Sequence, residues 1–270
     1  MNEYELERKW RSLTIRDNFI FSKTLEYNPD LCKRLLEMIL HIKIKNLSYP
    51  EREKVLEMRT DSKGIRLDVY VEEEDGDRSF DIEMQITDSD DLPKRIRYYQ
   101  GLIDMDKLKR GQFYKELGES FIIFICTFDL FGKGRHMYTF KETCAEVPNL
   151  LLGDGATKIF LNTKGFLEDV GDDLKAFLDY VESGIVAGKF TREVDDTVQI
   201  VKSNRMAVKE YMTYEMTLRE MEFKTAERIA LKLLEMGESF EFVNQVTDLS
   251  IKRIAELAEK IRKSESKKFN

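Results

Sequence analysis

The sequence predicts an α/β protein in which a mixed sheet is flanked by helices and followed by an all-α C-terminal extension. Three observations lead to this prediction. Two runs, 65–71 and 80–86, alternate apolar and polar residues around an Asp-Gly pair, which is typical of a half-buried hairpin. Residues 120–128 are almost entirely apolar, as in a central strand covered on both faces. Beyond Lys189 the chain is charged and rich in helix-favouring residues.

The turn of the hairpin predicts its register. A type I′ turn needs positive φ at both central positions, and Asp75-Gly76 suits them. With this pair as the loop, apolar residues of the two strands meet on one face. The pairs that this register brings together are Leu67 with Met84, Val69 with Ile82, and Val71 with Phe80.

The other face of the hairpin carries two carboxylates. Asp68 lies directly across from Glu83, with Gln85 on the same side, and such cross-strand partners have Cβ atoms about 4.5–5.5 Å apart. The two charges repel unless a cation or a shared proton neutralises them. Mg²⁺, with Mn²⁺ as the alternative, suits one or two carboxylates plus water and phosphate oxygens. The opposing interpretation is structural, because acidic residues are common on the wet face of an antiparallel hairpin.

The order Asp68, hairpin, Glu83-x-Gln85 resembles the D…(D/E)-x-K core of the PD-(D/E)XK nuclease superfamily. The segments 63–70, 81–85 and 92–99 resemble more closely the Rpn family of recombination-promoting nucleases and putative transposases, as do Asp17-Asn18-Phe19-Ile20-Phe21 and three later segments, 111–117, 121–128 and 158–162. The resemblance implies a restriction-endonuclease-like fold. It also implies a metal-dependent DNA endonuclease that hydrolyses phosphodiester bonds, with a link to recombination or transposition. Asp68 and Glu83 would be its metal ligands, and the carbonyl of Met84 a third.

Gln85 departs from the superfamily pattern, which has lysine at this position. A glutamine is no base and can only orient water or phosphate through its amide, so catalysis at this site would involve Asp68, Glu83 and Gln85 with another source of positive charge. Arg66, Lys94 and Arg97 are candidates for that charge. The missing lysine also supports the alternative function, a noncatalytic nucleic-acid-binding or protein-binding module that retains the nuclease fold.

A basic segment follows the hairpin. Between Asp91 and Lys115 there are seven basic and three acidic residues, interleaved with aromatic ones. Lys94, Arg95 and Arg97 are therefore candidate contacts to a DNA backbone beside the metal. A solvated helix face is the competing interpretation.

The remaining elements follow from local signals. Helices are expected at 30–40, 93–108 and 166–181, and strands at 136–140 and 157–161. Asp17 suits either a site or a helix cap, and Glu37 is a weak candidate for an additional metal ligand from the early helix.

The C-terminal part is expected to form its own region. We divide the chain into a nuclease-like domain, 1–189, and residues 190–270, a helical arm with a helix-turn-helix-like tail. Short helices at 226–236, at 240–246 and from Ser250 onwards, with Lys252 and Arg253 in the first turn of the last, would suit either DNA binding or a helical homodimer.

The composition describes an ordinary soluble protein. The chain has 270 residues, 42% of them hydrophobic, and a net charge of −7. It contains neither a membrane-length apolar run nor a basic-then-apolar leader, so the cytoplasm is the expected location. Three scattered cysteines and two unrelated histidines predict neither a disulfide framework nor a zinc site.

Overall fold

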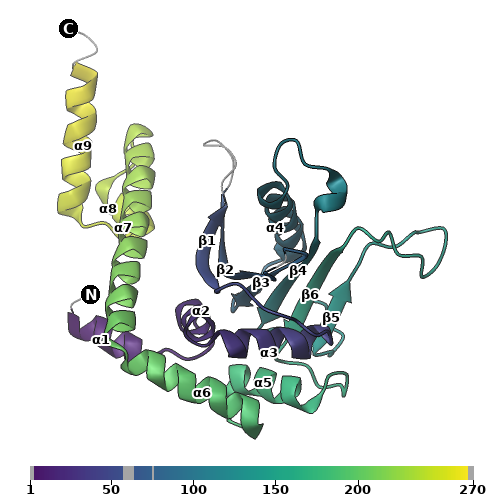
Figure 1. Ribbon diagram of the computed structural model, residues 1–270. Coiled ribbons are helices and arrows are strands. Elements are labelled where there is room, and N and C mark those ends of the chain that lie inside the picture. The colour runs from purple at the N-terminus through teal and green to yellow at the C-terminus, as the bar shows by residue number, and fades with distance from the viewer. Residues whose placement is uncertain (1–2, 57–63, 75, 267–270) are drawn as a thin grey trace. The chain divides into compact units, whose positions relative to one another are not determined.

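The computed structural model describes residues 3–56, 64–74 and 76–266, and the chain divides into two compact units, Met1–Ala207 and Val208–Asn270. The described part of the first unit contains a six-stranded sheet in the order β1-β2-β3-β4-β6-β5 (Figure 1). The strands are β1 (Glu51–Leu56), β2 (Ile65–Glu72), β3 (Arg78–Gln85), β4 (Glu119–Cys126), β5 (Met137–Phe140) and β6 (Ala156–Asn162). This architecture confirms the predicted mixed sheet with flanking helices and a helical C-terminal extension.

The sheet is antiparallel on one side and parallel in the middle. Strands β1, β2 and β3 pair antiparallel, whereas β3, β4 and β6 run parallel. The hairpin register is as predicted, with Val69 opposite Ile82 and Val71 opposite Phe80. Asp75 lies outside the described residues. Gly76 has a φ of 76°, and its N–H donates to the carbonyl of Glu73 at 2.8 Å, so Gly76 is the last residue of a hydrogen-bonded turn and not the second central residue expected of a type I′ turn.

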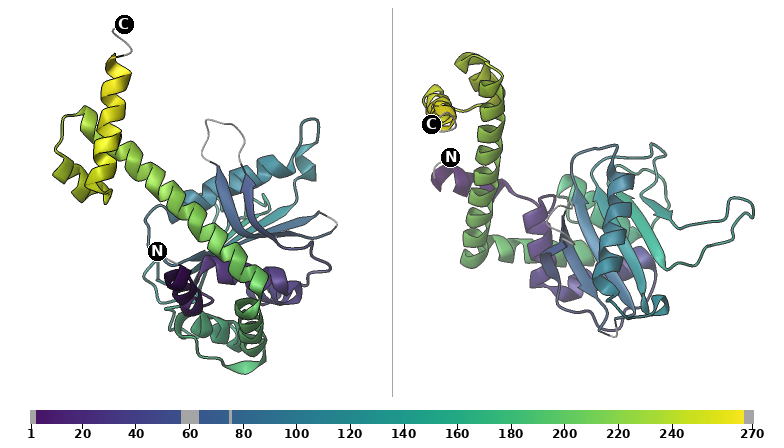
Figure 2. Two further views of the ribbon diagram at one scale, coloured as in Figure 1. Left: turned by 90° about the vertical axis from the view of Figure 1, so that its left-hand side faces the viewer. Right: turned by 90° about the horizontal axis from the view of Figure 1, so that it is seen from above.

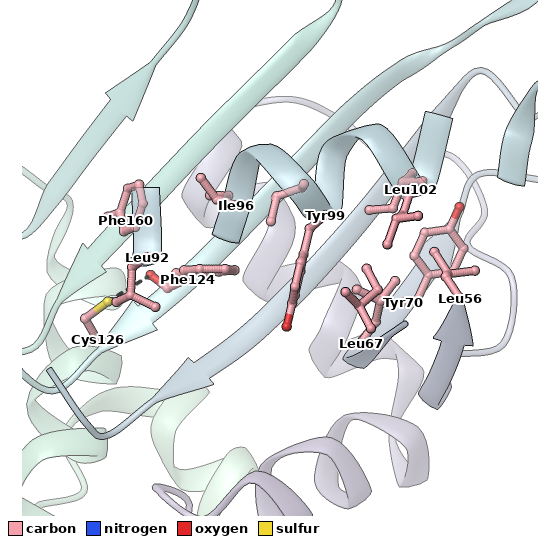
Figure 3. Packing of buried hydrophobic residues seen from close by; sticks show 13 residues of the cluster. Leu56, Leu67, Tyr70, Leu92, Ile96, Tyr99, Leu102, Phe124, Cys126 and Phe160 are labelled. Carbon is pink, nitrogen blue, oxygen red and sulfur yellow. Dashed lines mark hydrogen bonds between the residues drawn. The ribbon is translucent and has the colours of Figure 1, made fainter. Parts of the chain in front are cut away.

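Both faces of the sheet are covered by helices. Helix α4 (Leu92–Lys107) lies on one face, and α2 (Asn18–Tyr27) and α3 (Pro29–Leu40) lie on the other (Figures 1 and 2). Figure 3 shows the core beneath α4, where Tyr99 packs edge-on against Phe124 at 6.0 Å between ring centroids. The expectation of a wet acidic face on the hairpin is therefore wrong, because the crossover from β3 to the parallel strand β4 carries α4 over that face.

Most predicted elements are present, with two differences in the first unit. Helix α5 (Asp172–Ser183) begins later than expected, because the segment before it folds back: the N–H of Phe166 donates to the carbonyl of Gly134 at 2.9 Å. Strand β1 and helix α1 (Glu3–Ser12) were not expected from the sequence, since β1 is mostly charged. No helix in the described ranges is both long and apolar enough to cross a membrane.

Helix α6 (Gly188–Ser203) belongs with the first compact unit. It packs on α2 and α5, and the Phe190 ring lies 5.9 Å from that of Phe177. The boundary expected at 189/190 therefore falls inside the first unit, because Phe190, Val194 and Val198 complete its core.

The second unit contains α7 (Arg205–Glu235) from Val208 onwards, α8 (Phe240–Thr247) and α9 (Ile251–Ser266). The expected helix 226–236 is the last part of α7 rather than a separate helix. Residues of all three helices share a small core, and the hydroxyl of Ser250 accepts from the N–H of Arg253 at 3.3 Å, as predicted for a cap. The Arg253 side chain pairs with Glu227 and Glu256, so it stabilises this helical arrangement.

Candidate functional site

Asp68 and Glu83 meet where strands β2 and β3 stop pairing. The backbone pairing runs from Glu72 opposite Ser79 to Val69 opposite Ile82. Beyond that point the N–H of Asp68 donates to Glu83 Oε1 at 2.8 Å, and the N–H of Met84 donates to Asp68 Oδ2 at 3.1 Å. The two side chains thus take hydrogen bonds from backbone groups that a continued ladder would satisfy, and this fixes both carboxylates beside each other.

Gln85 and Arg95 complete this polar cluster. Gln85 Nε2 donates to Glu83 Oε2 at 3.3 Å, and Gln85 Oε1 accepts from an Arg95 guanidinium nitrogen at 3.0 Å. A second nitrogen of Arg95 lies 3.5 Å from Glu83 Oε2. Arg95 comes from the first turn of α4 and also donates to the hydroxyl of Tyr99 at 3.1 Å. The guanidinium therefore occupies the position beside the carboxylates where a cation is needed.

Three side chains of the cluster, two carboxyls and one amide, are buried. Asp68 is 9% exposed, Glu83 1% and Gln85 7%. Burial raises the pKa of Asp68 to about 6. Burial, together with the neighbouring Asp68, raises the pKa of Glu83 to about 8. The charges of Arg66 and Arg95 act in the opposite direction but do not offset burial, so the two carboxyls favour the protonated form unless a further positive charge lies beside them.

Asp81 is a third buried acid of this region. It precedes Glu83 by two residues on β3, is fully buried, and neither carboxyl oxygen has a hydrogen-bond partner among the described residues. Burial, followed by the charges of Glu83 and Asp68, raises its pKa well above the usual value. Asp81 was not singled out from the sequence, although the two-residue period of β3 places it on the same face as Glu83.

Helix α2 contributes another residue that sequence reasoning missed. Asn18 Nδ2 lies 3.4 Å from Asp68 Oδ1. Asp17, the residue before it, caps α2 by accepting from the N–H of Phe19 at 3.0 Å, which confirms the cap interpretation of Asp17. Glu37 lies elsewhere, since its carboxylate accepts from the N–H of Ile44 at 3.0 Å.

The other predicted cations lie differently from Arg95. Lys94 and Arg97 are exposed on α4, and Arg66 lies 3.8 Å from Glu53. The basic segment extends along the whole of α4, so its two ends lie at opposite ends of the helix. Lys107 pairs with Glu72 at 2.7 Å near the far end of the helix, so this part of the segment does not adjoin the carboxylates.

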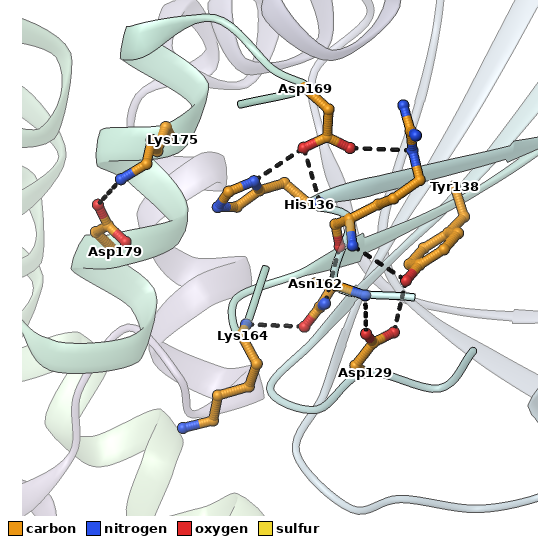
Figure 4. A network of polar contacts seen from close by, with 10 residues as sticks. Asp129, His136, Tyr138, Asn162, Lys164, Asp169, Lys175 and Asp179 are labelled. Carbon is orange, nitrogen blue, oxygen red and sulfur yellow. Dashed lines mark hydrogen bonds and ion pairs between the residues drawn. The ribbon is translucent and has the colours of Figure 1, made fainter. Parts of the chain in front are cut away.

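A separate polar network fixes the loop after β4. Asp129 accepts from the hydroxyl of Tyr138 at 2.8 Å and from three backbone N–H groups, and His136 Nδ1 lies 3.0 Å from Asp169 Oδ1 (Figure 4). The N–H of Thr127 donates to the carbonyl of Gln85 at 3.0 Å, which joins the start of this loop to the end of β3. The network stabilises the loop that follows β4.

The comparison with protein families decides the identity of this architecture. Residues 18–166, more than half of the chain, match the family described as PD-(D/E)XK nuclease family transposase. The chain belongs to this family. The match spans α2, the carboxylate hairpin, α4 and the parallel strands, and it confirms the resemblance seen in the sequence. Neither a curated protein nor a solved structure matches the chain.

The donor set fits a hard divalent cation. Among the described residues no three His, Cys, Asp or Glu side chains are arranged as a metal-binding group, so a dedicated all-protein cage is not formed. Mg²⁺ does not need one, because it is commonly held by one or two carboxylates together with water and substrate phosphate. Two adjoining carboxylates of raised pKa supply that minimal set.

Proposed function

We propose that this member of the PD-(D/E)XK nuclease family is a metal-dependent DNA endonuclease, linked to recombination or transposition, that hydrolyses phosphodiester bonds with Mg²⁺ or, as the alternative, Mn²⁺. The observation that supports this most strongly is the burial of Asp68 and Glu83 against each other with one guanidinium beside them. A protein gains nothing in stability from two such acids, and retaining them is typical of a catalytic centre.

Asp68 and Glu83 would hold the cation, and the carbonyl of Met84 would be a third donor. A bound divalent cation supplies Lewis-acid chemistry, because it lowers the pKa of water and stabilises negative charge on phosphate. Asn18 orients the Asp68 carboxylate from α2, and the Asp68 N–H orients that of Glu83. The chain thereby keeps both ligands in fixed rotamers before any cation arrives.

Gln85 and Arg95 would act together in place of the superfamily lysine. Gln85 cannot accept a proton at neutral pH, so its amide orients water or a phosphate oxygen. Arg95 carries a permanent charge and a planar array of donors, which suits an anionic phosphate. Its contact with Gln85 Oε1 at 3.0 Å holds the amide with its nitrogen directed towards Glu83.

Replacing Arg95 with Ala is expected to lower cleavage by about 10- to 100-fold, as for other groups that orient a metal ligand. Arg97→Ala is the matched control, since Arg97 is exposed on the same helix. It should weaken DNA binding modestly and reduce its dependence on salt by about one phosphate contact. Single-turnover rates at saturating protein separate the two effects. Equal rate losses in both variants would contradict a specific role for Arg95.

The proposed function is tested by cleavage of supercoiled and linear DNA with Mg²⁺, with Mn²⁺ and with EDTA. Wild type should cleave with either cation and not with EDTA, and Asp68→Asn should be inactive while retaining its fold. Glu74→Gln, at an exposed acid in the turn of the same hairpin, should retain activity. Well-folded wild type that cleaves with neither ion would refute the proposal and favour the noncatalytic binding module, for which Gln85 in place of lysine is the supporting observation.

A further inference from the structure

The outer side of α4 carries an exposed stripe of basic, aromatic, small and apolar residues. Lys94, Arg97, Tyr98, Gly101 and Met105 are exposed and recur at intervals of three or four residues. Two acids of the helix are engaged by other residues: Asp104, seven residues after Arg97 and on the same side, accepts from Gln100 at 2.9 Å, and Asp106 lies 3.3 Å from Lys54. One end of the stripe lies in the first turn of α4, which carries Arg95 on its inward side, and three exposed acids precede this turn: Asp88, Asp90 and Asp91.

The other end of the stripe leads to an aromatic tip, residues 109–116, that follows α4. Phe113 is 67% exposed and Tyr114 is 89% exposed, the latter being the highest value among the large hydrophobic side chains in the described chain. Lys109, Arg110 and Lys115 flank the rings, and Lys115 Nζ lies 5.5 Å from the centroid of Phe113. Exposed aromatic rings among cations are suited to stacking with bases and pairing with phosphates.

The tip is ordered by its own hydrogen bonds. Gln112 Oε1 accepts from the N–H of Lys109 at 2.6 Å, and Glu116 accepts from the N–H of Phe113 at 3.4 Å. Gly118 anchors its base, because a Cβ there would lie 2.3 Å from the carbonyl oxygen of Asp77. The two rings are thus presented on a fixed turn, which limits the entropy lost when a ligand binds.

We infer that a single-stranded stretch of the DNA substrate runs along the exposed stripe of α4 and stacks its bases on Phe113 and Tyr114. The inference rests on the proposed function and extends it to a substrate class, DNA with a single-stranded flank. In a duplex the faces of the bases are hidden within the stack, so two exposed rings gain most from an unpaired strand. The residues around the rings are polar or charged, and the apolar area is therefore limited to the rings themselves, unlike the core of a protein interface.

The dimensions set the length of that flank. From Lys94 to Lys107 the helix rises by about 20 Å at about 1.5 Å per residue. At about 3.4 Å per stacked nucleotide this corresponds to roughly six nucleotides between the carboxylates and the tip. A flank shorter than this would not reach Phe113 and Tyr114.

The inference is tested by equilibrium binding in EDTA, so that no cleavage is needed. The probes are one fluorescein-labelled duplex with blunt ends and the same duplex with an eight-nucleotide 3′ or 5′ overhang carrying 2-aminopurine. The Phe113→Ala/Tyr114→Ala double variant should bind one overhang substrate about 10- to 100-fold more weakly than wild type and should lose the quenching of 2-aminopurine. Its affinity for the blunt duplex should change less than about threefold.

Two further variants separate the stripe from the tip. Met105→Glu adds an acid at the end of the stripe nearer the tip and should weaken overhang binding, whereas Tyr27→Glu, at an exposed tyrosine of α2, should not. Equal losses for blunt and overhang DNA in the double variant, or unchanged binding of both, would overturn the inference, and the latter would indicate a protein partner for the tip.

The cleavage assay distinguishes failure here from failure of the proposed function. Asp68→Asn should bind the overhang substrate as wild type does and not cleave it. If wild type cleaves DNA but its binding does not depend on Phe113 and Tyr114, the nuclease proposal stands and the single-strand inference is wrong. If wild type never cleaves but binds overhang DNA through these rings, the single-strand inference stands and the nuclease proposal is wrong.

Discussion

Replacing Glu83 with Gln is expected to abolish cleavage and, at the same time, to stabilise the metal-free protein at alkaline pH. Cleavage should fall by at least about a thousandfold, because one of two carboxylate ligands and its charge are lost. Stability should rise because the buried carboxylate, 1% exposed, must ionise above its raised pKa of about 8, whereas an amide stays neutral. The amide oxygen of Gln can accept the same hydrogen bond from the N–H of Asp68, so the local geometry should be preserved.

The size of this stabilisation depends on pH. Each pKa unit is equivalent to about 1.36 kcal/mol. An unfolded Glu ionises above a pKa of about 4.3, whereas folded Glu83 ionises above about 8, so wild type loses stability across this whole range and the advantage of the variant is already present at pH 6. Between pH 6 and pH 9 the advantage should grow by roughly 1–3 kcal/mol more. Urea unfolding in EDTA at pH 6 and at pH 9 measures the free energy of unfolding of the variant and of wild type. A stability difference that is the same at pH 6 and pH 9 would contradict the burial of an uncompensated charge.

Glu73 provides the matched control on the same hairpin. It is 2% exposed, as buried as Glu83, but its carboxylate lies 2.7 Å from Arg78 Nε. Glu73→Gln removes an acid that has its own cation, and it should therefore destabilise the protein at both pH values and leave the chemistry of cleavage intact. The contrast separates a functional acid from a structural one.

Stabilisation by Mg²⁺ is expected to increase steeply with pH. The pKa values of Asp68 and Glu83 are raised on folding, so the metal-free fold is most stable where both are protonated and loses stability as the pH rises through about 6 and about 8. A divalent cation binds the ionised pair and offsets this loss. At Mg²⁺ a hundredfold above its Kd the gain is about 2.7 kcal/mol, or roughly 5–10 °C in Tm for a unit of this size.

Thermal unfolding with Mg²⁺ and with EDTA at pH 5.5 and pH 8.5 checks this expectation. The Tm difference between the two conditions should be large at pH 8.5 and small at pH 5.5, because protons compete for the same oxygens. The Asp68→Asn/Glu83→Gln double variant should show no Tm difference between Mg²⁺ and EDTA at either pH. Other groups that influence the pair are Asp81, Arg66, Arg95 and Glu53, and they remain in the double variant. A Tm gain from Mg²⁺ that persists in the double variant would show that the cation binds at another site.

Much of the first unit could be predicted because its signals are local. The alternation of 65–71 and 80–86 with an intervening Asp-Gly predicts the hairpin register, and with it the meeting of Asp68 and Glu83. The continuous apolar run predicts β4, which carries Phe124 and is buried from both sides. In each case the pattern within one segment is sufficient to predict the strand.

The remainder depends on tertiary packing that no single segment encodes. The hairpin alone suggests a wet acidic face, and only the placement of α4 over β3 buries Glu83 and Asp81. Arg95 stands among several basic residues, and its selection over Lys94 and Arg97 follows from the rotation of α4, which turns Tyr99 and Arg95 inwards together. Asn18 reaches Asp68 from a helix fifty positions earlier in the chain.

The most direct test of the metal centre is Mn²⁺ binding measured by electron paramagnetic resonance at pH 8.5, in wild type and in the Asp68→Asn/Glu83→Gln double variant. The two buried carboxylates predict saturable binding by wild type that is lost in the well-folded double variant. Equal Mn²⁺ affinity in both proteins would show that Asp68 and Glu83 are not the ligands.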